Sequence, residues 1–283
     1  MSFHEVPFVK VVSVGNDFVL VESSSLPFED EGLLRELAIS ASRRRLGIGS
    51  DGLLVLSVAA NELSLRMFNP DGSEDFCGNG LRCAAVYARR KGFAPAEFSI
   101  RHGGKLTPTQ VAADGETVDQ VFGPATFDPE RVPLARGATE AFMKRIEVCG
   151  RSLTLSALST GSTHAVVFVE DLPGDEEFLA ISRAVETHEM FPERASMIWA
   201  RTEAPDRLRL RIWERGVGET LGCGTGSLAA AAAHMRINAA HGPLKIISKG
   251  GELTVEAASW DGELSLRGRA RILYEGRYRL ALG

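Results

Sequence analysis

A short motif occurs twice in this chain and restricts the possible folds more than any other feature. Residues 77–80 read Cys-Gly-Asn-Gly and residues 223–226 read Cys-Gly-Thr-Gly, and two adjacent alanines follow each copy at the same distance. The copies are 146 residues apart in a chain of 283 residues. The same offset aligns a glycine turn at Gly15 with one at Gly161, and each turn leads into a strand-like run. We therefore predict an internal duplication that produces two similar domains.

The composition is that of a globular protein and argues against several classes of function. Hydrophobic residues make up 44% of the chain and charged residues 24%,. The net charge of −5 offers no concentrated positive charge for a nucleic acid, and we interpret Arg43–Arg45 as a solvated helix face,. No apolar run reaches the ~18 residues that a membrane helix needs. The first ten residues lack a basic segment followed by an apolar core, so we expect no secretion signal and a cytoplasmic protein,.

Alternating strand and helix patterns predict the α+β class. The helix that should follow Cys223 contains the run Ala229–Ala233, and small apolar residues on all sides of a helix indicate burial,. We therefore expect two pseudo-symmetric domains, each a curled mixed β-sheet around a central helix. Their predicted limits are residues 1–126, with Cys77, and residues 127–269, with Cys223. Four helices are expected, over Glu31–Arg45, Gly80–Lys91, Glu176–His188 and Gly226–Asn238,.

The four cysteines do not have the spacing of a disulfide scaffold or of a zinc site. No C-x-x-C pair is present, and with no secretion signal we expect the thiols to be free and no metal to be bound,. Cys83 is interpreted as a core position and its neighbour Arg82 as a helix-surface position. Cys77 and Cys223 could also be small buried hydrophobic residues, but their equivalent places before two helix starts favour a chemical role.

A cysteine at a helix N-terminus is suited to acid/base chemistry. The unpaired N–H groups and the helix dipole favour an anion, which lowers the pKa of a thiol, and the following glycines leave those N–H groups open to a carboxylate. Two facing copies would present two thiols and a double cradle for one carboxylate. One thiolate could remove an α-proton while the opposite thiol returns one to the other face. The amides would carry the charge that develops, so we expect an amino-acid epimerase or racemase without a cofactor.

These residues resemble the diaminopimelate epimerase family, and the resemblance covers most of the chain. Besides the two cysteine motifs, it rests on Gly15-Asn16-Asp17-Phe18, residues 47–54, residues 68–73, Thr160-Gly161, His164, Phe191-Pro192 and residues 214–220, which read Glu-Arg-Gly-Val-Gly-Glu-Thr. The family is a group of epimerases that need no cofactor. The resemblance implies a domain fold of β-sheets curled around helices, an active site in the cleft between two domains that close on the substrate, and a homodimer. It also implies that the last strand, residues 270–283, returns to the first domain.

The resemblance also assigns roles to individual residues. Cys77 and Cys223 would be the acid/base pair, and His164 and Glu214 would tune the thiols. The backbone amides of Gly78-Asn79 and Gly224-Thr225 would hold the α-carboxylate. Further contacts with the amino-acid substrate would come from Asn16, Asn69, Glu214 and Arg215, with Arg215 pairing the remote carboxylate. Taken alone, Asn16 and Asn69 are also ordinary turn residues, His164 could serve packing, and Arg215 could form a surface ion pair.

Two departures from the family pattern concern the substrate. The family usually has asparagine at the positions of Ser162 and Ser196, and both asparagines contact the far end of the substrate. A serine lacks the paired donor and acceptor of an amide. The first hypothesis is epimerisation of LL-diaminopimelate to meso-diaminopimelate. The alternative is a racemase for another free amino acid with the same two-cysteine mechanism, and a third hypothesis is a thiol redox or binding protein on the same scaffold.

Overall fold

The computed structural model describes residues 2–59 and 62–281 and divides the chain into two compact units. Unit 1 contains the residues up to Gln120 and those from Gly268 onward, and unit 2 is Val121–Arg267. These bounds lie a few residues from the predicted domain limits at 126 and 269. The chain enters unit 2 within strand β7 (Thr117–Phe122) and leaves it within strand β16 (Leu264–Ala281). The sequence also predicts a turn at residues 60–61, which lie outside the described residues.

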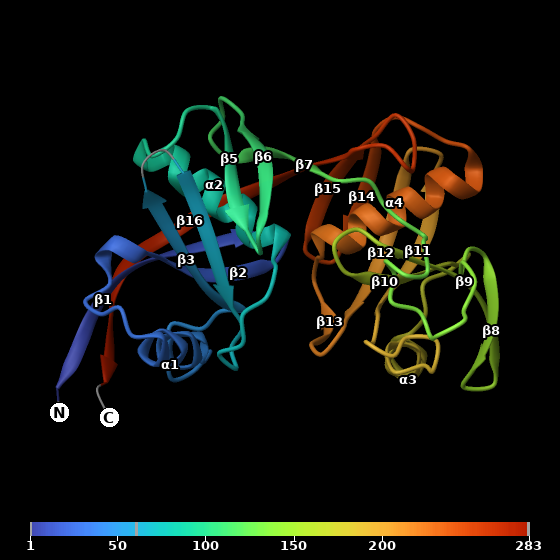
Figure 1. The fold of residues 1–283 in the computed structure, drawn as a ribbon, viewed down its shortest axis with the longest axis horizontal. Coiled ribbons are helices and arrows are strands. Elements are labelled where there is room, and N and C mark those ends of the chain that lie inside the picture. Colours follow the sequence, from blue (N-terminus) through green and yellow to red (C-terminus); the bar gives the residue numbers. More distant parts are fainter. Residues whose placement is uncertain (1, 60–61, 282–283) are drawn as a thin grey trace. The chain divides into compact units, whose positions relative to one another are not determined.

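Unit 1 is a sheet that closes around one helix. Its strands follow the order β1-β2-β3-β4-β5-β6-β7-β16, and β16 also pairs with β1, which completes the ring. Helix α2 (Gly78–Lys91) contacts β1 to β6 and lies among these strands, while α1 (Glu31–Ser42) packs on β3 (Figure 1). The remaining strands are β1 (Phe3–Ser13), β2 (Asn16–Glu22), β3 (Gly52–Ala59), β4 (Glu62–Phe68), β5 (Glu97–His102) and β6 (Lys105–Val111), with a 3-10 turn at Ser23–Ser25.

Unit 2 also has a sheet that packs around a central helix. Its sheet has the order β15-β14-β12-β11-β10-β9-β8, and the short β13 pairs with β12. Helix α4 (Gly224–Asn238) contacts β9 to β12, β14 and β15, while α3 (Asp175–Glu186) packs on β8 and β11. The strands are β8 (Lys144–Val148), β9 (Arg151–Ser159), β10 (Thr163–Phe168), β11 (Ser196–Ala204), β12 (Arg207–Glu214), β13 (Gly218–Thr220), β14 (Leu244–Ser248) and β15 (Gly251–Glu256).

The element order confirms the α+β class and the repeat. In unit 1, two strands, α1, two strands and α2 follow one another. In unit 2, three strands, α3, three strands and α4 do so, and further strands complete each sheet. The central helices are buried because strands cover them, and Ala229–Ala233 have no exposed surface,. The same enclosure corrects the prediction for Arg82, which is fully buried rather than on the helix surface. Helix α2 has no solvent-facing side at that position.

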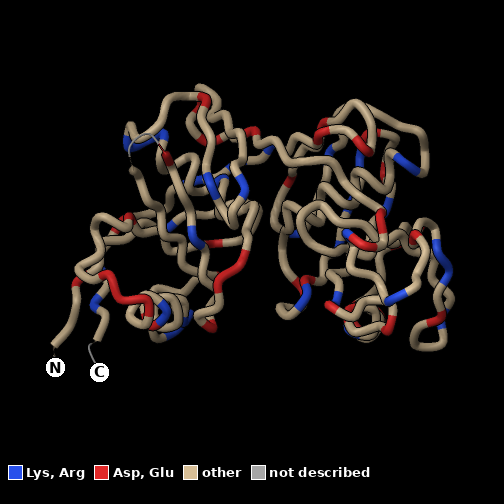
Figure 2. Tube along the Cα trace, viewed as in Figure 1, with Lys and Arg blue, Asp and Glu red and all other residues tan. Residues whose placement is uncertain are grey.

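The observed helix boundaries differ from the predicted ones at the starts of the two central helices and at the end of α1. Both central helices begin two residues earlier than predicted, so that Cys77 and Cys223 become the N-cap residues themselves. Helix α1 ends at Ser42, which leaves Arg43–Arg45 in the following loop, where Arg44 pairs with Asp17 and Asp51. Positively and negatively charged residues are interspersed over both units (Figure 2). None of the helices among the described residues has the length and apolar content needed to cross a membrane.

Candidate active site

The two cysteines cap their helices in nearly the same conformation. Cys77 has φ −139° and ψ 108°, and Cys223 has φ −131° and ψ 121°. Each sulfur accepts the backbone N–H of the third helical residue, at 3.3 Å from Gly80 N and at 3.4 Å from Gly226 N. The duplicated motif therefore places each thiol at the positive end of a helix dipole.

The glycines at these third positions are required by packing. A Cβ on Gly80 would lie 2.8 Å from Leu54 Cδ2, and one on Gly226 would lie 2.7 Å from Ile198 Cδ1. The same Cβ atoms would come within 3.6 Å of the Cys77 sulfur and 3.4 Å of the Cys223 sulfur. Glycine thus lets each helix start sit against its sheet without displacing the side chain of Leu54 or of Ile198,.

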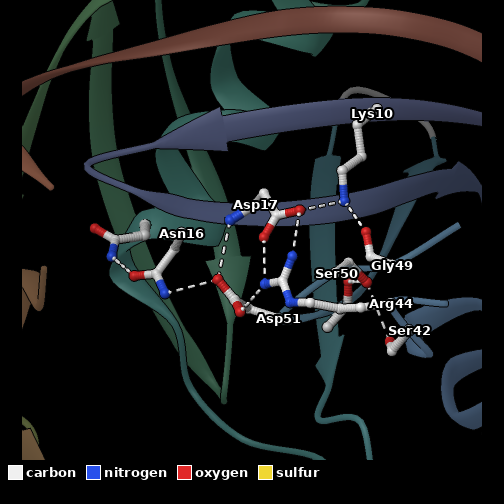
Figure 3. Close-up of polar contacts among 10 residues, drawn as sticks. Lys10, Asn16, Asp17, Ser42, Arg44, Gly49, Ser50 and Asp51 are labelled. Carbon is white, nitrogen blue, oxygen red and sulfur yellow. Dashed lines mark hydrogen bonds and ion pairs between the residues drawn. The ribbon is translucent and has the colours of Figure 1, made fainter. Parts of the chain in front are cut away.

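In unit 1, the amide side chains of Asn16 and Asn79 form a chain of hydrogen bonds. Asn79 Nδ2 donates to Asn16 Oδ1 at 2.5 Å, and Asn16 Nδ2 donates to Asp51 Oδ2 at 3.1 Å (Figure 3). Arg82 donates to Asn79 Oδ1 and, through Nε, to Ser13 Oγ at 3.1 Å. Because both ends of the Asn16 amide are engaged, its orientation is fixed. The structure thus brings two predicted substrate-binding residues together beside the Cys77 cap.

A cluster of ion pairs keeps these hydrogen-bonded side chains in place. Arg44 bridges Asp51 at 2.6 Å and Asp17 at 2.8 Å, and the buried Lys10 pairs with Asp17 at 2.5 Å (Figure 3). Burial by itself raises the pKa of Asp17, but hydrogen bonds from Arg44 and Lys10 outweigh it and bring that pKa below the ordinary value,. Asp17 therefore stays ionised and keeps Lys10 and Arg44 in place.

The surroundings of Cys223 in unit 2 are more polar and more buried. The sulfur lies 3.4 Å from Thr225 Oγ1, and the Glu214 carboxylate forms a hydrogen bond with the thiol. Burial raises the pKa of Cys223 well above its ordinary value, and the charge of Glu214 raises it further, although the Thr225 and Gly226 donors act in the opposite direction,. The expected lowering of the thiol pKa by the helix is therefore wrong for Cys223, because desolvation is the larger effect.

His164 lies in β10 and is connected to Cys223 through two hydroxyls. Its Nε2 is 3.0 Å from Ser162 Oγ, which donates to Thr225 Oγ1 at 3.4 Å, and Thr225 contacts the Cys223 sulfur. Burial, with a smaller contribution from the charge of Arg215, lowers the pKa of His164 to about 3, so the imidazole is neutral at ordinary pH. Ser162, the first departure from the family pattern, is thus part of a contact chain that ends at the thiol.

Ser196, the second departure, is also engaged within the protein. It is buried beside His164 in the register between β10 and β11, and its Oγ accepts the backbone N–H of Arg215 at 3.1 Å. The exposed Arg215 side chain donates to the carbonyl of Glu193 at 3.0 Å. Both serine hydroxyls are therefore already used for contacts around His164 and Arg215.

Asn69 is the one predicted site residue held by its own turn. Its Nδ2 donates to Ser73 Oγ at 3.0 Å, and its backbone carbonyl accepts from Gly72 N at 2.9 Å. These contacts are typical of an asparagine that stabilises its own turn, which is the other role that the sequence allows for Asn69,. Across residues 2–59 and 62–281, no group of three or more His, Cys, Asp or Glu side chains has the arrangement of a metal site.

Three residues of this environment escaped the sequence analysis. Asp51 belongs to residues 47–54, which support the resemblance but carry no predicted role. Arg82 was placed on the surface, and His102, which accepts the Cys77 backbone N–H at 2.9 Å, carried no signal at all. All three act through contacts across the sheet or helix, which a linear pattern does not display.

The comparisons with known proteins agree with the geometry. The family model described as diaminopimelate epimerase matches residues 8–127 and 156–273. Among curated relatives, the diaminopimelate epimerase of Desulforudis audaxviator is 35% identical over 278 residues, covering 96% of this chain and 98% of its own. That of Moorella thermoacetica is 34% identical over 281 residues, covering 96% and 99%. The solved structure of a probable proline racemase from Agrobacterium radiobacter matches this chain with a TM-score of 0.68 at 15% identity. The match covers 98% of this chain and 93% of that chain and shows that the two share a fold. The chain belongs to the diaminopimelate epimerase family and is an isomerase of the epimerase type.

Proposed function

We propose that this protein converts LL-diaminopimelate to meso-diaminopimelate with Cys77 and Cys223 as the acid/base pair. The observation that carries the proposal is the pair of equivalent cysteine caps, each sulfur held by a glycine N–H at the start of a buried helix. Inversion needs two such groups, because a proton leaves one face of the α-carbon and another arrives at the opposite face.

In this mechanism the carbanion is stabilised by the helix starts. The backbone N–H groups of Gly78-Asn79 and of Gly224-Thr225 would hold the α-carboxylate, and negative charge that develops on it is favoured at helix N-termini. The proposal therefore needs no cofactor. The Asn16 amide, fixed between Asn79 and Asp51, would contact the substrate, as would Asn69 and Arg215.

Proton transfer at Cys223 would involve Glu214. The carboxylate hydrogen bonds with the thiol, so it can take the thiol proton when Cys223 acts as base and return it when Cys223 acts as acid,. His164 is neutral and reaches the thiol only through Ser162 and Thr225, so we assign it a tuning role through these hydroxyls.

The test is proton exchange in heavy water with matched cysteine variants. The product should carry deuterium at the inverted α-carbon. Cys77→Ala and Cys223→Ala should each lower turnover by about 10²–10⁴-fold or more. Cys149→Ser, at an exposed cysteine, should keep the wild-type rate. An alanine variant of Cys77 or Cys223 with normal turnover would reject the mechanism.

The alternative substrate, another free amino acid, is favoured by one observation. Ser162 and Ser196 are engaged with Thr225, His164 and the Arg215 backbone, so neither offers the amide that the family uses at the far end of the substrate,. A screen of free amino acids by chiral chromatography distinguishes the two. Turnover of diaminopimelate alone supports the first proposal, and racemisation of another amino acid in its place supports the second.

The cellular context follows from the proposed product. Meso-diaminopimelate would place the reaction in bacterial lysine and cell-wall precursor synthesis, in the cytoplasm. We also propose a homodimer, as is usual for the family, with a small-molecule amino acid as the only other partner. Sedimentation of the purified protein across a concentration series tests the dimer.

A further inference from the structure

His102 is a buried histidine whose two ring nitrogens are both engaged. It is the last residue of β5 and is paired in register with Leu65 of β4. Its Nδ1 lies 2.8 Å from the Leu65 carbonyl, and its Nε2 lies 2.9 Å from the backbone nitrogen of Cys77. The ring also stacks on Phe76 with 4.9 Å between the centroids and 21° between the planes. Three contacts therefore fix the imidazole directly behind the cysteine cap.

The partners of the ring determine its protonation state. The backbone N–H of Cys77 is a donor, so Nε2 must be the unprotonated acceptor, and Nδ1–H must donate to the Leu65 carbonyl,. Burial lowers the pKa of His102, which favours this neutral form, while the hydrogen bond to Leu65 and the charges of Glu74 and Asp75 act in the opposite direction. If Nε2 also carried a proton, its N–H would face the backbone N–H of Cys77, and the hydrogen bond between the two residues would be lost.

This arrangement differs between the two repeats. The residue at the same offset of 146 in unit 2 is Ser248, the last residue of β14, and its hydroxyl donates to the Gly251 carbonyl at 3.3 Å. The loop after β14 is tied instead by Gly250 N to the carbonyl of Leu221, two residues before Cys223, at 2.7 Å. An imidazole acceptor behind the cap is thus a feature of the Cys77 site and has no counterpart at position 248.

We infer that His102 is a positioning residue for Cys77, which it serves by accepting the cysteine backbone N–H and so holding the thiol at the start of α2. The inference rests on the proposed function of Cys77 as an acid/base group. The Cys77 carbonyl accepts the N–H of Leu81 within the helix, but the N–H of an N-cap residue lies outside the helical hydrogen bonds, and His102 is its acceptor,. With the backbone fixed, the sulfur remains 3.3 Å from Gly80 N, where that donor and the helix dipole favour the thiolate,.

The test compares His102→Asn with His102→Gln. Glutamine carries its amide oxygen at the position of Nε2 and can still accept from Cys77, whereas asparagine reaches only the position of Nδ1. Iodoacetamide alkylation of each cysteine, followed by peptide mass spectrometry without substrate, reports the thiolate fraction. At pH 7 we expect Cys77 to react about tenfold more slowly in His102→Asn, equivalent to one pKa unit. Cys223 should stay within about twofold and serves as the internal control.

Turnover adds an independent readout. His102→Asn should lower kcat with little change in KM, and His102→Gln should restore most of both the rate and the Cys77 reactivity. The inference fails if both variants behave like wild type, if both are equally impaired, or if the two cysteines slow down together. Should the asparagine variant not fold, the ¹⁵N chemical shifts of His102 in the wild-type protein decide the matter, because a protonated Nε2 contradicts the proposed contact. Alkylation needs no substrate, so these results are separate from loss of the proposed epimerase activity in Cys77→Ala.

Discussion

Replacing Glu214 by glutamine should change two properties of Cys223 in opposite directions. Burial is the first cause of the raised pKa of this thiol, and the carboxylate of Glu214 is the second. The variant removes the charge and keeps the shape of the side chain. The thiolate of Cys223 should therefore form more readily, while the group that we propose to exchange its proton is lost.

The size of the effect can be worked out from the contact. Two unit charges at a hydrogen-bonded separation of ~3.5 Å interact by roughly 4–5 kcal/mol at an effective dielectric constant of about 20. Glu214 is only half-buried, so solvent screens part of this interaction,. We expect the pKa of Cys223 to fall in the variant and its thiolate fraction at neutral pH to rise by about 10- to 100-fold,.

Two assays on the same preparation separate the effects. Alkylation of Cys223 by iodoacetamide, followed by peptide mass spectrometry between pH 6 and 9, should become about 10- to 100-fold faster at pH 7. Deuterium incorporation into diaminopimelate should slow by about 10²-fold or more. The control is Glu203→Gln, which removes one carboxylate of a surface ion pair with Arg209 in the same unit and should change neither rate,. Slower or unchanged alkylation of Cys223 in Glu214→Gln would refute the electrostatic reasoning.

Two further substitutions test the packing of unit 2. Gly226→Ala should destabilise the protein by ~1–3 kcal/mol in urea unfolding, because the new Cβ meets Ile198 at 2.7 Å, and should lower turnover, because this contact lies at the helix start that carries Cys223,. Gly123→Ala, which meets no atom within 4 Å, should do neither. Arg236→Ala should destabilise the protein by ~2–3 kcal/mol in the same urea assay and leave turnover per folded molecule unchanged. The Arg236 guanidinium pairs with Glu140 and lies 4.0–4.6 Å from the ring centroids of Phe127, Phe142 and Trp260. Wild-type stability in Arg236→Ala would show that these ring contacts contribute nothing.

The repeat and the burial of the central helices could be predicted because short local sequence patterns indicate both. A glycine-containing motif after each cysteine and a run of alanines on all helix faces each have one main physical interpretation. The helix starts were placed two residues late, because the pattern shows where apolar periodicity begins and the cap lies before it. The error for Arg82 has a related origin, since a charged residue is usually exposed unless it is paired, and its partners Ser13 and Asn79 are supplied by the fold.

The environment of each thiol could not be predicted from local patterns. The pKa of Cys223 depends on burial and on Glu214, and their effect exceeds that of the helix dipole,. The contact between His102 and Cys77 joins residues 25 positions apart through the register of β4 and β5, and neither residue type signals it. Such contacts depend on which strands become neighbours, and that is a property of the whole sheet.

Duplication supplies two equivalent thiols, but the proposed reaction begins with one of them as thiolate and the other as thiol. Identical surroundings would give both thiols the same pKa, and the mixed state with one thiolate and one thiol would then have no preferred assignment. The repeats differ at this point: Cys77 is half-buried and has a neutral imidazole behind its backbone, whereas Cys223 is buried beside a carboxylate that raises its pKa. In the proposed mechanism this difference assigns the proton to Cys223 in the free enzyme. In the proposed mechanism, the contacts that differ between the repeats, around His102 in one unit and around Glu214 in the other, therefore contribute to the chemistry together with the caps that the repeats share.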